Sequence, residues 1–283
     1  MKKNKFYVIL KNLLPDKLFL NLKFFKKFNK FVNFKNPVLF NQKINYLKIY
    51  DDTDDKTNYQ DKLKVKEIIK GEIGPKHIIE TLKILDLSKS FKDQTVEFDK
   101  FILKTNFESG KVYICSNKSE FDFSFVEEET KKQFKEKSYL DGREYHYSRI
   151  EKKVFVERLL DDHINLIDYK IYCFNGLPKY FHLDVNRHTN HQRCFYDDRW
   201  NKIENFTVHY PYYSGYIPKP DKLDEMLNLA KIISSSFKFV RVDFYYVNNE
   251  IYFGEATFYP GSGFEKFSDP VYEEIFGELL NLK

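Results

Sequence analysis

The sequence lacks the residues and runs that mark several common protein classes. It has only three cysteines, Cys115, Cys173 and Cys194, which lie far apart without a Cys-x-x-Cys pair. This spacing argues against a disulfide framework and indicates a reducing compartment. No run of about 18 uninterrupted apolar residues occurs, and no apolar segment of signal-peptide type follows the first lysines. We therefore expect a cytoplasmic protein.

Two familiar nucleotide-binding signatures are also missing. The chain contains neither the G-x-x-x-x-G-K-[ST] loop nor the His-Arg-Asp and Asp-Phe-Gly motifs of protein kinases, so these classes lose their support. Glycine and proline are sparse, at 10 and 9 of 283 residues, whereas aromatic residues make up 18%. This composition fits neither disorder nor collagen, and the length allows a substantial core.

Positive charge is concentrated at the start of the chain. Residues 1–36 contain ten lysines and one acid, Asp16, while the whole chain carries only +5. Apolar residues stand between these lysines, and Pro15 divides them into two amphipathic helical segments. Such a leader could lie on an anionic membrane at the inner face of the cell, or pack on the protein body with its lysines in water. No nucleic-acid-binding signature accompanies the charge, so no nucleic-acid partner is expected.

The segment 240–263 predicts a β-hairpin on which two carboxylates face each other. A short loop at its midpoint would place Asp243 opposite Glu255, and Arg241 opposite Thr257, on one face. Like charges this close are destabilising unless a cation offsets them. Two explanations fit: a Mg²⁺ ion held by the carboxylates and the threonine hydroxyl, or Arg241 as an ion pair on a solvated face. The other, apolar face is expected to hold Val242, Phe244, Tyr246, Tyr252, Ala256 and Phe258.

The rest of the pattern predicts an α+β fold. Residues 51–60 are expected to form a polar connection, because five of the first ten positions after Tyr50 are charged acids or lysine. Helices are expected at 61–74 and 219–237, where apolar residues recur at helical spacing. Strands are expected within 99–115, 153–160, 168–174 and 177–185, the last two joined by a turn at Asn175–Gly176.

Seven segments, taken together and in order, resemble the TupA-like branch of the ATP-grasp superfamily, which is found in bacterial surface-polysaccharide gene clusters. They extend from about Asn36 to Phe267. The segments are "NPVLFNQKINYLKIYD", "DKLKVKE", "FILKTNFESG", "LDGREYHYSRI", "FVERLL", "DYKIYCFNGLPKYFHLDVNRHTNHQRCFYDDRWN" and "FVRVDFYYVNNEIYFGEATFYPGSGFEKF".

This resemblance implies an ATP-grasp fold, in which ATP lies between two α+β lobes under a mobile loop. Residues 1–60 would then form the basic helical leader and N-terminal region, and residues 61–283 the ATP-grasp domain. Its lobes are expected at roughly 61–155 and 156–283.

The same resemblance implies a set of ATP-binding residues. Lys62 and Lys104 are expected to reach the phosphates, and Ser109 and Gly110 to cover them. Relatives tend to have His-Gly-Ser-Gly-Gly in this loop, whereas residues 107–111 read Phe-Glu-Ser-Gly-Lys. The loop therefore departs from the family pattern.

The adenosine contacts are carried over from two further motifs. Glu157 is expected to accept a hydrogen bond from the adenine amino group, and the backbone of Leu159 and Leu160 to supply further bonds. Asp168 is expected to bind the ribose hydroxyls, with Lys170 turned to phosphate.

The resemblance favours the metal explanation for the hairpin. Asp243 and Glu255 become Mg²⁺ ligands, and Thr257 becomes a weaker third where ATP-grasp enzymes commonly have asparagine. Arg241, with Lys104 and Lys170, would offset charge on the transferred phosphoryl group.

Acceptor-binding residues are expected on two further segments. The side chains of Arg187, His191 and Arg193 would face an anionic acceptor, and backbone N–H groups of Gly261, Ser262 and Gly263 would bind an acyl phosphate. His188, His191 and Cys194 have metal-like spacing, but no second pair of ligands supports zinc.

The resulting prediction is an ATP-dependent ligase that joins a carboxylate and an amine on a surface-polysaccharide sugar or precursor through an acyl phosphate. Two alternatives stay open. One is a glycan kinase using the same ATP site, and the other is a glycosyltransferase or membrane-associated glycan-synthesis protein, for which residues 51–55, "DDTDD", are the nearest match to a metal-binding Asp-x-Asp.

Overall fold

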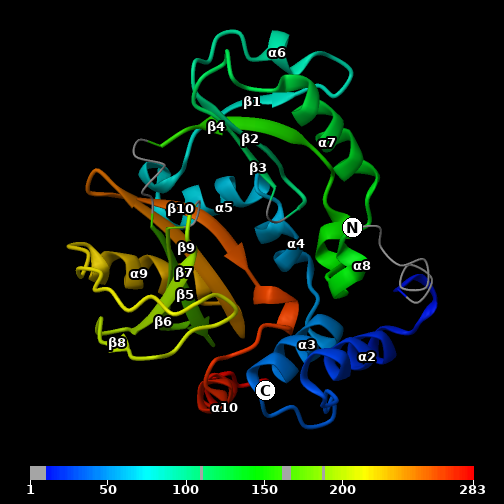
Figure 1. Cartoon of the computed structure of the whole chain (residues 1–283), viewed down its shortest axis with the longest axis vertical. Helices are drawn as coiled ribbons and strands as arrows, with labels where there is room; N and C mark the ends of the chain where they lie inside the picture. Colours follow the sequence, from blue (N-terminus) through cyan, green and yellow to red (C-terminus); the bar gives the residue numbers. More distant parts are fainter. Residues whose placement is uncertain (1–10, 109–110, 161–166, 187–188) are drawn as a thin grey trace.

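Two antiparallel sheets organise the chain in the computed structural model, which describes residues 11–108, 111–160, 167–186 and 189–283. Figure 1 shows the smaller sheet above the larger one. The smaller sheet has the order β1-β4-β2-β3, and the larger has the order β10-β9-β5-β6-β7-β8. The strands of the smaller sheet are β1 (Thr81–Leu85), β2 (Phe101–Thr105), β3 (Val112–Cys115) and β4 (Val154–Arg158). Those of the larger sheet are β5 (Asp168–Phe174), β6 (Leu177–Val185), β7 (Gln192–Asp197), β8 (Lys202–Ile203), β9 (Phe239–Val247) and β10 (Glu250–Thr257).

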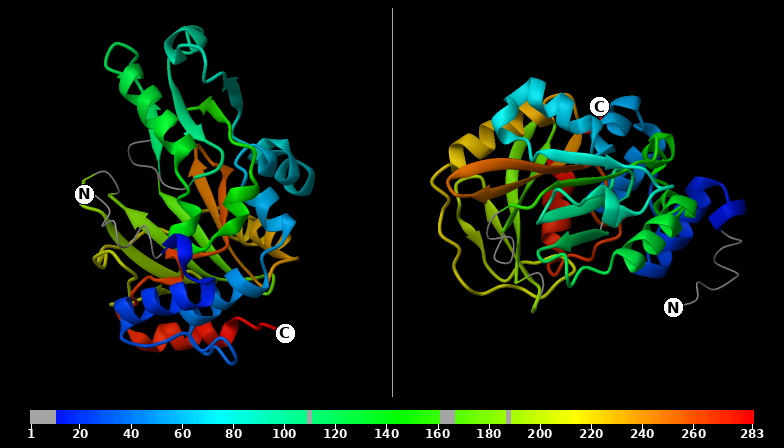
Figure 2. Two further views of the ribbon diagram at one scale, coloured as in Figure 1. Left: turned by 90° about the vertical axis from the view of Figure 1, so that its right-hand side faces the viewer. Right: turned by 90° about the horizontal axis from the view of Figure 1, so that it is seen from above.

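Helices cover both sheets and fill the space beside them (Figures 1 and 2). The α-helices are α2 (Asp16–Phe28), α3 (Phe40–Tyr50), α4 (Asp54–Gln60), α5 (Lys64–Ile73), α6 (Phe91–Gln94), α7 (Phe123–Lys135), α8 (Tyr139–Gly142), α9 (Leu223–Ser234) and α10 (Pro270–Leu279). Short 3₁₀ turns are η1 (Pro75–His77), η2 (Tyr145–Arg149) and η3 (Pro260–Gly263). Among the described residues, no helix combines the length and apolar character needed to cross a membrane.

Each sheet has its own apolar core. Aromatic side chains from α3, β5, β9 and α10 meet in the larger core, where the rings of Phe40 and Phe239 lie 5.1 Å apart. The smaller core contains Phe101, Val154 and Val156. The expected α+β class is therefore confirmed, because each sheet buries one face under helices.

The predicted hairpin forms with the predicted pairing, but a two-residue turn and a bulge produce it rather than a longer loop. Asn248 and Asn249 both adopt positive φ, of 52° and 61°, as a two-residue turn requires. A bulge follows between Phe253 and Glu255, and it restores the pairing of Glu255 with Asp243 and of Thr257 with Arg241.

The bulge also corrects one expectation about the apolar face. Tyr252 pairs with Tyr245, so it lies on the same side as Asp243 rather than with Val242 and Phe244. It packs on a small cluster that includes Leu160 and Val247. The prediction was wrong because simple alternation does not allow for the extra residue, Gly254.

The expected polar connection at residues 51–60 was wrong as well, because most of it is helix α4. The Thr53 hydroxyl accepts a bond from the Lys56 amide, and Asp54 and Asp55 stand in the first turn. Both features stabilise a helix N-terminus. The polar composition therefore reflects helix capping rather than a loop.

The leader packs on the body through α2, which begins directly after Pro15 as expected. Its Leu20 and Phe24 join a cluster with Val32 and Phe264. Further along the chain, the change from the smaller to the larger sheet falls between β4 and β5, whereas the expected lobe boundary at 155/156 lies inside β4.

Candidate active site

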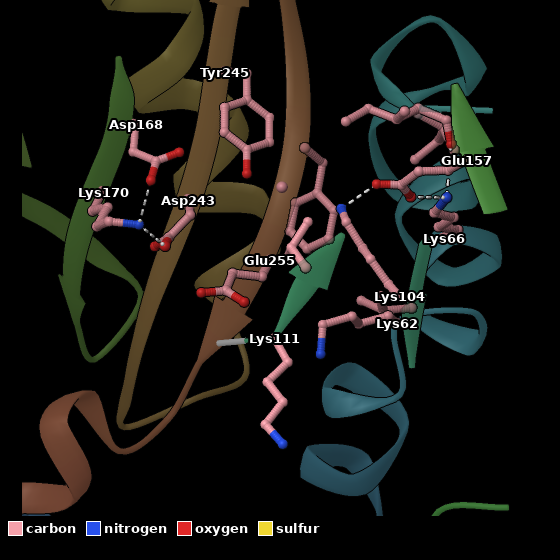
Figure 3. Close-up of a pocket in the computed structure, with 16 residues that line it drawn as sticks. Lys62, Lys66, Lys104, Lys111, Glu157, Asp168, Lys170, Asp243, Tyr245 and Glu255 are labelled. Atoms are coloured by element: carbon pink, nitrogen blue, oxygen red, sulfur yellow. Dashed lines mark hydrogen bonds and ion pairs between the residues drawn. The ribbon is translucent and has the colours of Figure 1, made fainter. Parts of the chain in front are cut away.

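A cavity of about 110 Å³ lies between the two sheets, where the hairpin β9–β10 faces β2, β4 and α5 (Figure 3). Five lysines and four acids come together there from segments far apart in the sequence. The charged lining residues are Lys62, Lys66, Lys104, Lys111, Lys170, Glu157, Asp168, Asp243 and Glu255. This collection of ammonium groups and hard oxygen donors suits a polyphosphate with a divalent cation.

Glu157 on β4 lies between two lysines on one wall of the cavity. Its Oε2 accepts a bond from Lys66 Nζ at 2.7 Å, and its Oε1 is bonded to Lys104 Nζ. Burial acts to raise the pKa of Glu157, but the two ammonium groups hold it below its usual value. The two carboxylate oxygens thus hold Lys66 and Lys104 in place, and the expected contacts of Lys104 with phosphate and of Glu157 with adenine stay predictions.

Lys62 stands just before α5, close to the loop that was expected to cover the phosphates. Its Nζ donates to the backbone oxygen of Glu108, and burial lowers the pKa of Lys62. Ser109 and Gly110 lie outside the described residues. Lys111, which follows them, lines the cavity and pairs with Glu129 at 3.6 Å.

Asp243 is the centre of the opposite wall. Lys170 Nζ donates to Asp243 Oδ2 at 2.7 Å and lies 3.1 Å from Asp168. Arg241 donates to both Asp243 oxygens at 2.7 Å. Burial acts to raise the pKa of Asp243, but Arg241 and Lys170 lower it below its usual value. The ion pair that the alternative expected for Arg241 is therefore present, but Asp243 is 3% exposed, so its setting on a solvated face was wrong.

Arg241 also connects the remaining predicted metal ligands. Its Nη2 donates to Glu255 Oε1 at 3.2 Å and to Thr257 Oγ1 at 3.0 Å. Burial acts to lower the pKa of Arg241, but Asp243 raises it well above its usual value. Arg241 and Lys170 therefore offset the two carboxylates of the hairpin in this structure.

The carboxylate oxygens of the hairpin suit Mg²⁺ if they supply only one or two of its ligands. Among the described residues, no three His, Cys, Asp or Glu side chains are grouped to hold a metal ion. Mg²⁺ usually takes one or two carboxylates and completes its shell with water and substrate phosphates. The facing carboxylates of Asp243 and Glu255 match this pattern, and the Glu255 side chain is the more accessible at 39% exposed.

A buried lysine, Lys48, holds the predicted acceptor segment at η3 in position. Gly261, Ser262 and Gly263 all have positive φ, and Lys48 Nζ donates to Ser262 O at 2.6 Å and to its Oγ at 3.0 Å. Burial lowers the pKa of Lys48 to about 7. The Ser262 amide donates to Tyr259 O, so the expectation that this N–H is free for an acyl phosphate was wrong.

The other predicted acceptor residues lie on β7 and just before it. Arg193 donates from Nε to Asp184 at 2.8 Å and from Nη1 to Val208 O at 2.7 Å. His191 stacks on Tyr210 with ring centroids 3.7 Å apart. Arg187 and His188 lie outside the described residues. Arg193 is buried, and its guanidinium joins β6 to the segment that follows β8.

A second cavity, of about 320 Å³, adjoins the first one at Lys111. Ser262 and Tyr147 line it, and four of its six charged lining residues are acidic. The acids are Glu108, Glu136, Asp141 and Glu144, and the bases are Lys23 and Lys111. The lysine-rich cavity and the acidic cavity thus share one lining residue, Lys111.

Sequence reasoning missed three residues of this region, and two of them left a signal. Lys66 follows Lys62 by four residues, and Tyr245 follows Asp243 by two on the same strand face. Lys48 gave no signal, because a lysine in an amphipathic helix usually faces water. Its role depends on how α3 packs against η3.

Two α+β lobes that enclose a lysine-rich cavity, with paired carboxylates on a hairpin, form the arrangement of an ATP-grasp protein. A family model described as TupA-like ATPgrasp matches residues 42–281. The chain therefore belongs to the TupA-like ATP-grasp family.

Solved structures similar to this chain include several ligases. D-alanine–D-alanine ligase from Helicobacter pylori is 16% identical, with 86% of this chain and 69% of that one covered and a TM-score of 0.44. The corresponding ligase from Bacillus anthracis is 14% identical, with a TM-score of 0.42. There the match covers 71% of this chain and 57% of that one, so this chain spans little more than half of the ligase's length.

A third similar structure is the ATP-grasp ligase PsnB in complex with a precursor variant, Mg and ADP. It is 9% identical, with 72% of this chain and 51% of that one covered and a TM-score of 0.36. No curated protein matches this chain.

Proposed function

We propose that this protein is an ATP-dependent carboxylate–amine ligase that forms an amide on a surface-polysaccharide sugar or its precursor. The observation that supports it best is the union of five lysines with the Asp243–Glu255 pair in one cavity. Family membership adds ATP as the nucleotide.

Each wall of the cavity has a part in this chemistry. Lys62 and Lys104 bind the triphosphate from one side, and Lys170 binds it from the other. Lys66 holds Glu157 in place instead, because its three N–H groups donate to Ile79 O, Thr81 Oγ1 and Glu157. Asp243 and Glu255, with Thr257, would hold Mg²⁺, which when bound would neutralise charge on the terminal phosphates.

The reaction proceeds in two displacements. A carboxylate oxygen of the substrate attacks the γ-phosphorus, and the bond from that phosphorus to the β-phosphate oxygen breaks, which releases ADP. The ammonium group of the second substrate gives one proton to water, and the free amine nitrogen then attacks the acyl carbon. Phosphate leaves and accepts the second proton from the nitrogen, which yields the neutral amide. Arg241 offsets the charge that develops on the transferred phosphoryl group.

The acidic second cavity is the place for the amine. An ammonium group is attracted by Asp141 and Glu144, while the carboxylate substrate and phosphates are attracted by the adjoining lysines. Lys48 positions Ser262 at the floor of this cavity.

The glycosyltransferase alternative loses support, because two acids of its candidate metal motif at residues 51–55 are paired with basic side chains. Lys56 Nζ pairs with Asp51 at 2.6 Å, and Arg149 makes two bonds of 2.8 Å to Asp52. These acids thus stabilise the α4 region. A glycan kinase is separated from the ligase by its products, because it yields ADP and phosphosugar without free phosphate.

A nucleotide panel with Asp243→Asn tests the proposal. Mg²⁺ with ATP is expected to raise the Tm of the wild type by several degrees, because ligand binds only the folded state, and UDP-sugars are expected to leave it unchanged. Asp243→Asn should lose most of the Mg²⁺-dependent shift, whereas the exposed control Asp99→Asn should keep it. Full Mg²⁺–ATP stabilisation in Asp243→Asn would contradict the site.

A further inference from the structure

Helix α2 leaves a row of apolar side chains in solvent. While Leu20 and Phe24 are buried, the other side of the helix exposes Leu18, Leu22 and Phe25 by 47, 45 and 43%. The spacing of four and three residues places these three side chains on one face. Figures 1 and 2 show α2 on the outside of the molecule, beside α3.

The row continues into the segment that follows the helix. Phe31, 58% exposed, stacks on Phe25 with ring centroids 4.8 Å apart. Residues 13–38 contain six of the sixteen exposed large apolar side chains in the part of the chain that the structure describes. Such a concentration on a surface marks an interaction site rather than random exposure.

Lysines are frequent on α2 and on the segment that follows it. The exposed ones are Lys17, Lys26, Lys27, Lys30 and Lys35. Asp16, the only acid in residues 1–36, is neutralised by Arg143 at 2.8 Å and accepts from the Tyr145 hydroxyl. The apolar row therefore lies on a lysine-rich segment whose one acid, Asp16, is paired with Arg143.

We propose that this face, formed by α2 and the segment to Val38, docks the protein on an anionic lipid bilayer. The apolar row would enter the boundary of the acyl chains, while the lysines contact anionic headgroups. A second copy of the chain is the less suitable occupant, because two lysine-rich faces would repel each other.

The opposite side of α2 faces the acidic second cavity. Lys23 donates to the backbone oxygen of Asp141 at 2.6 Å and lines the acidic second cavity. One helix therefore separates that cavity from the docking face. Docking would hold the cavity beside the lipid surface, although the docking inference does not depend on the proposed ligase chemistry.

Sedimentation with vesicles tests the electrostatic part on the full-length protein. The wild type is expected to bind vesicles of equal phosphatidylglycerol and phosphatidylcholine, and to bind phosphatidylcholine alone at least tenfold more weakly. Lys26→Glu with Lys27→Glu should weaken binding to the anionic vesicles at least tenfold, because each basic residue near the surface contributes roughly a fivefold factor. Lys92→Glu with Lys100→Glu changes the net charge equally on another surface and should leave binding within twofold.

Paired apolar variants test the other part. Leu22→Ser with Phe25→Ser should lose at least tenfold in vesicle affinity, while Val96→Ser with Val271→Ser, also at exposed positions, should lose less than twofold. All four double variants, the two lysine pairs and the two apolar pairs, should keep the circular dichroism spectrum of the wild type.

Three outcomes would overturn the proposal: equal binding to both lipid mixtures, equal losses in the leader and control variants, or no vesicle binding. Light scattering, which measures the molar mass in solution, then tests whether a second copy of the chain occupies the face. A wild-type dimer that Leu22→Ser with Phe25→Ser converts to monomer, with no vesicle binding, would assign the face to self-association.

Discussion

At the scale of single residues, the cavity depends on buried charges that hold one another in position. Glu157 fixes Lys66 and Lys104, while Asp243 fixes Lys170 and Arg241. Each carboxylate is nearly inaccessible, so its charge would be costly to bury without these partners. The lysines that would meet phosphate are thus positioned before nucleotide arrives.

Replacing Glu157 should show this dependence. Glu157→Gln leaves two partly buried ammonium groups without their counterion, so the free energy of unfolding should fall by about 3 kcal/mol. ADP should recover part of the loss, because its phosphates replace the missing charge. Urea denaturation with and without ADP measures both effects, and Glu97→Gln, at an exposed ion pair with Lys83, is the control.

The same pair predicts a pH dependence. The pKa of Glu157 is lower in the folded protein than its ordinary value of 4.5. Its stabilisation is therefore complete above that value and disappears as pH falls through the lower, folded pKa. The stability difference between wild type and Glu157→Gln should be constant from about pH 7 to 5 and shrink below about pH 4.5. A difference that grows in acid would contradict this sign.

At the scale of elements, the hairpin owes its register to a turn and a bulge acting together. The Asn248–Asn249 turn alone would pair residues whose numbers sum to an odd value, and Gly254 supplies the extra residue that sets Glu255 against Asp243. A Cβ at Gly254 would lie 3.1 Å from Asp243 O and 3.1 Å from the Tyr245 ring. The bulge therefore needs a small residue.

Two glycine substitutions should have opposite effects. Gly254→Val is expected to destabilise the fold by about 2 kcal/mol through crowding and to weaken Mg²⁺–ATP binding, because it shifts the carboxylate pair. Gly71→Ala, inside α5 with no atom within 4 Å of the added Cβ, should stabilise it by about 0.5–1 kcal/mol. Thermal melts and nucleotide titrations measure both, and unchanged nucleotide affinity in a folded Gly254→Val would contradict the bulge argument.

At the scale of the whole molecule, Arg143 joins the leader to the body. Its guanidinium donates to Lys11 O at 2.8 Å and Leu14 O at 3.1 Å, pairs with Asp16, and lies over the Phe19 ring at 4.2 Å. One buried side chain after α8 thus binds the start of α2. The position of the docking face relative to the two cavities depends on it.

Arg143→Met should therefore loosen the leader selectively. Hydrogen–deuterium exchange of α2 amides is expected to rise at least tenfold, because the variant leaves backbone acceptors and Asp16 without their buried partner, while exchange in β9 and β10 stays near wild type. The control Arg199→Met replaces an exposed arginine. Uniform acceleration in all elements would indicate global destabilisation instead.

The sequence alone determined the features that depend on local periodicity and on ordered motifs. It predicted the antiparallel hairpins, the start of α2 after Pro15 and the family, because strand alternation, turn residues and motif order can be read from the sequence. The Asp243–Glu255 pairing was also predicted, but it depends on the bulge at Gly254, which simple alternation does not include. Tertiary structure decided what faces each buried charge: Glu157 meets Lys66, Lys48 meets Ser262, and Arg143 meets the leader. These partners lie 91, 214 and 132 positions apart in the chain. No local pattern records such pairings, because they arise only when separately folded elements pack and each buried charge must find a counterpart.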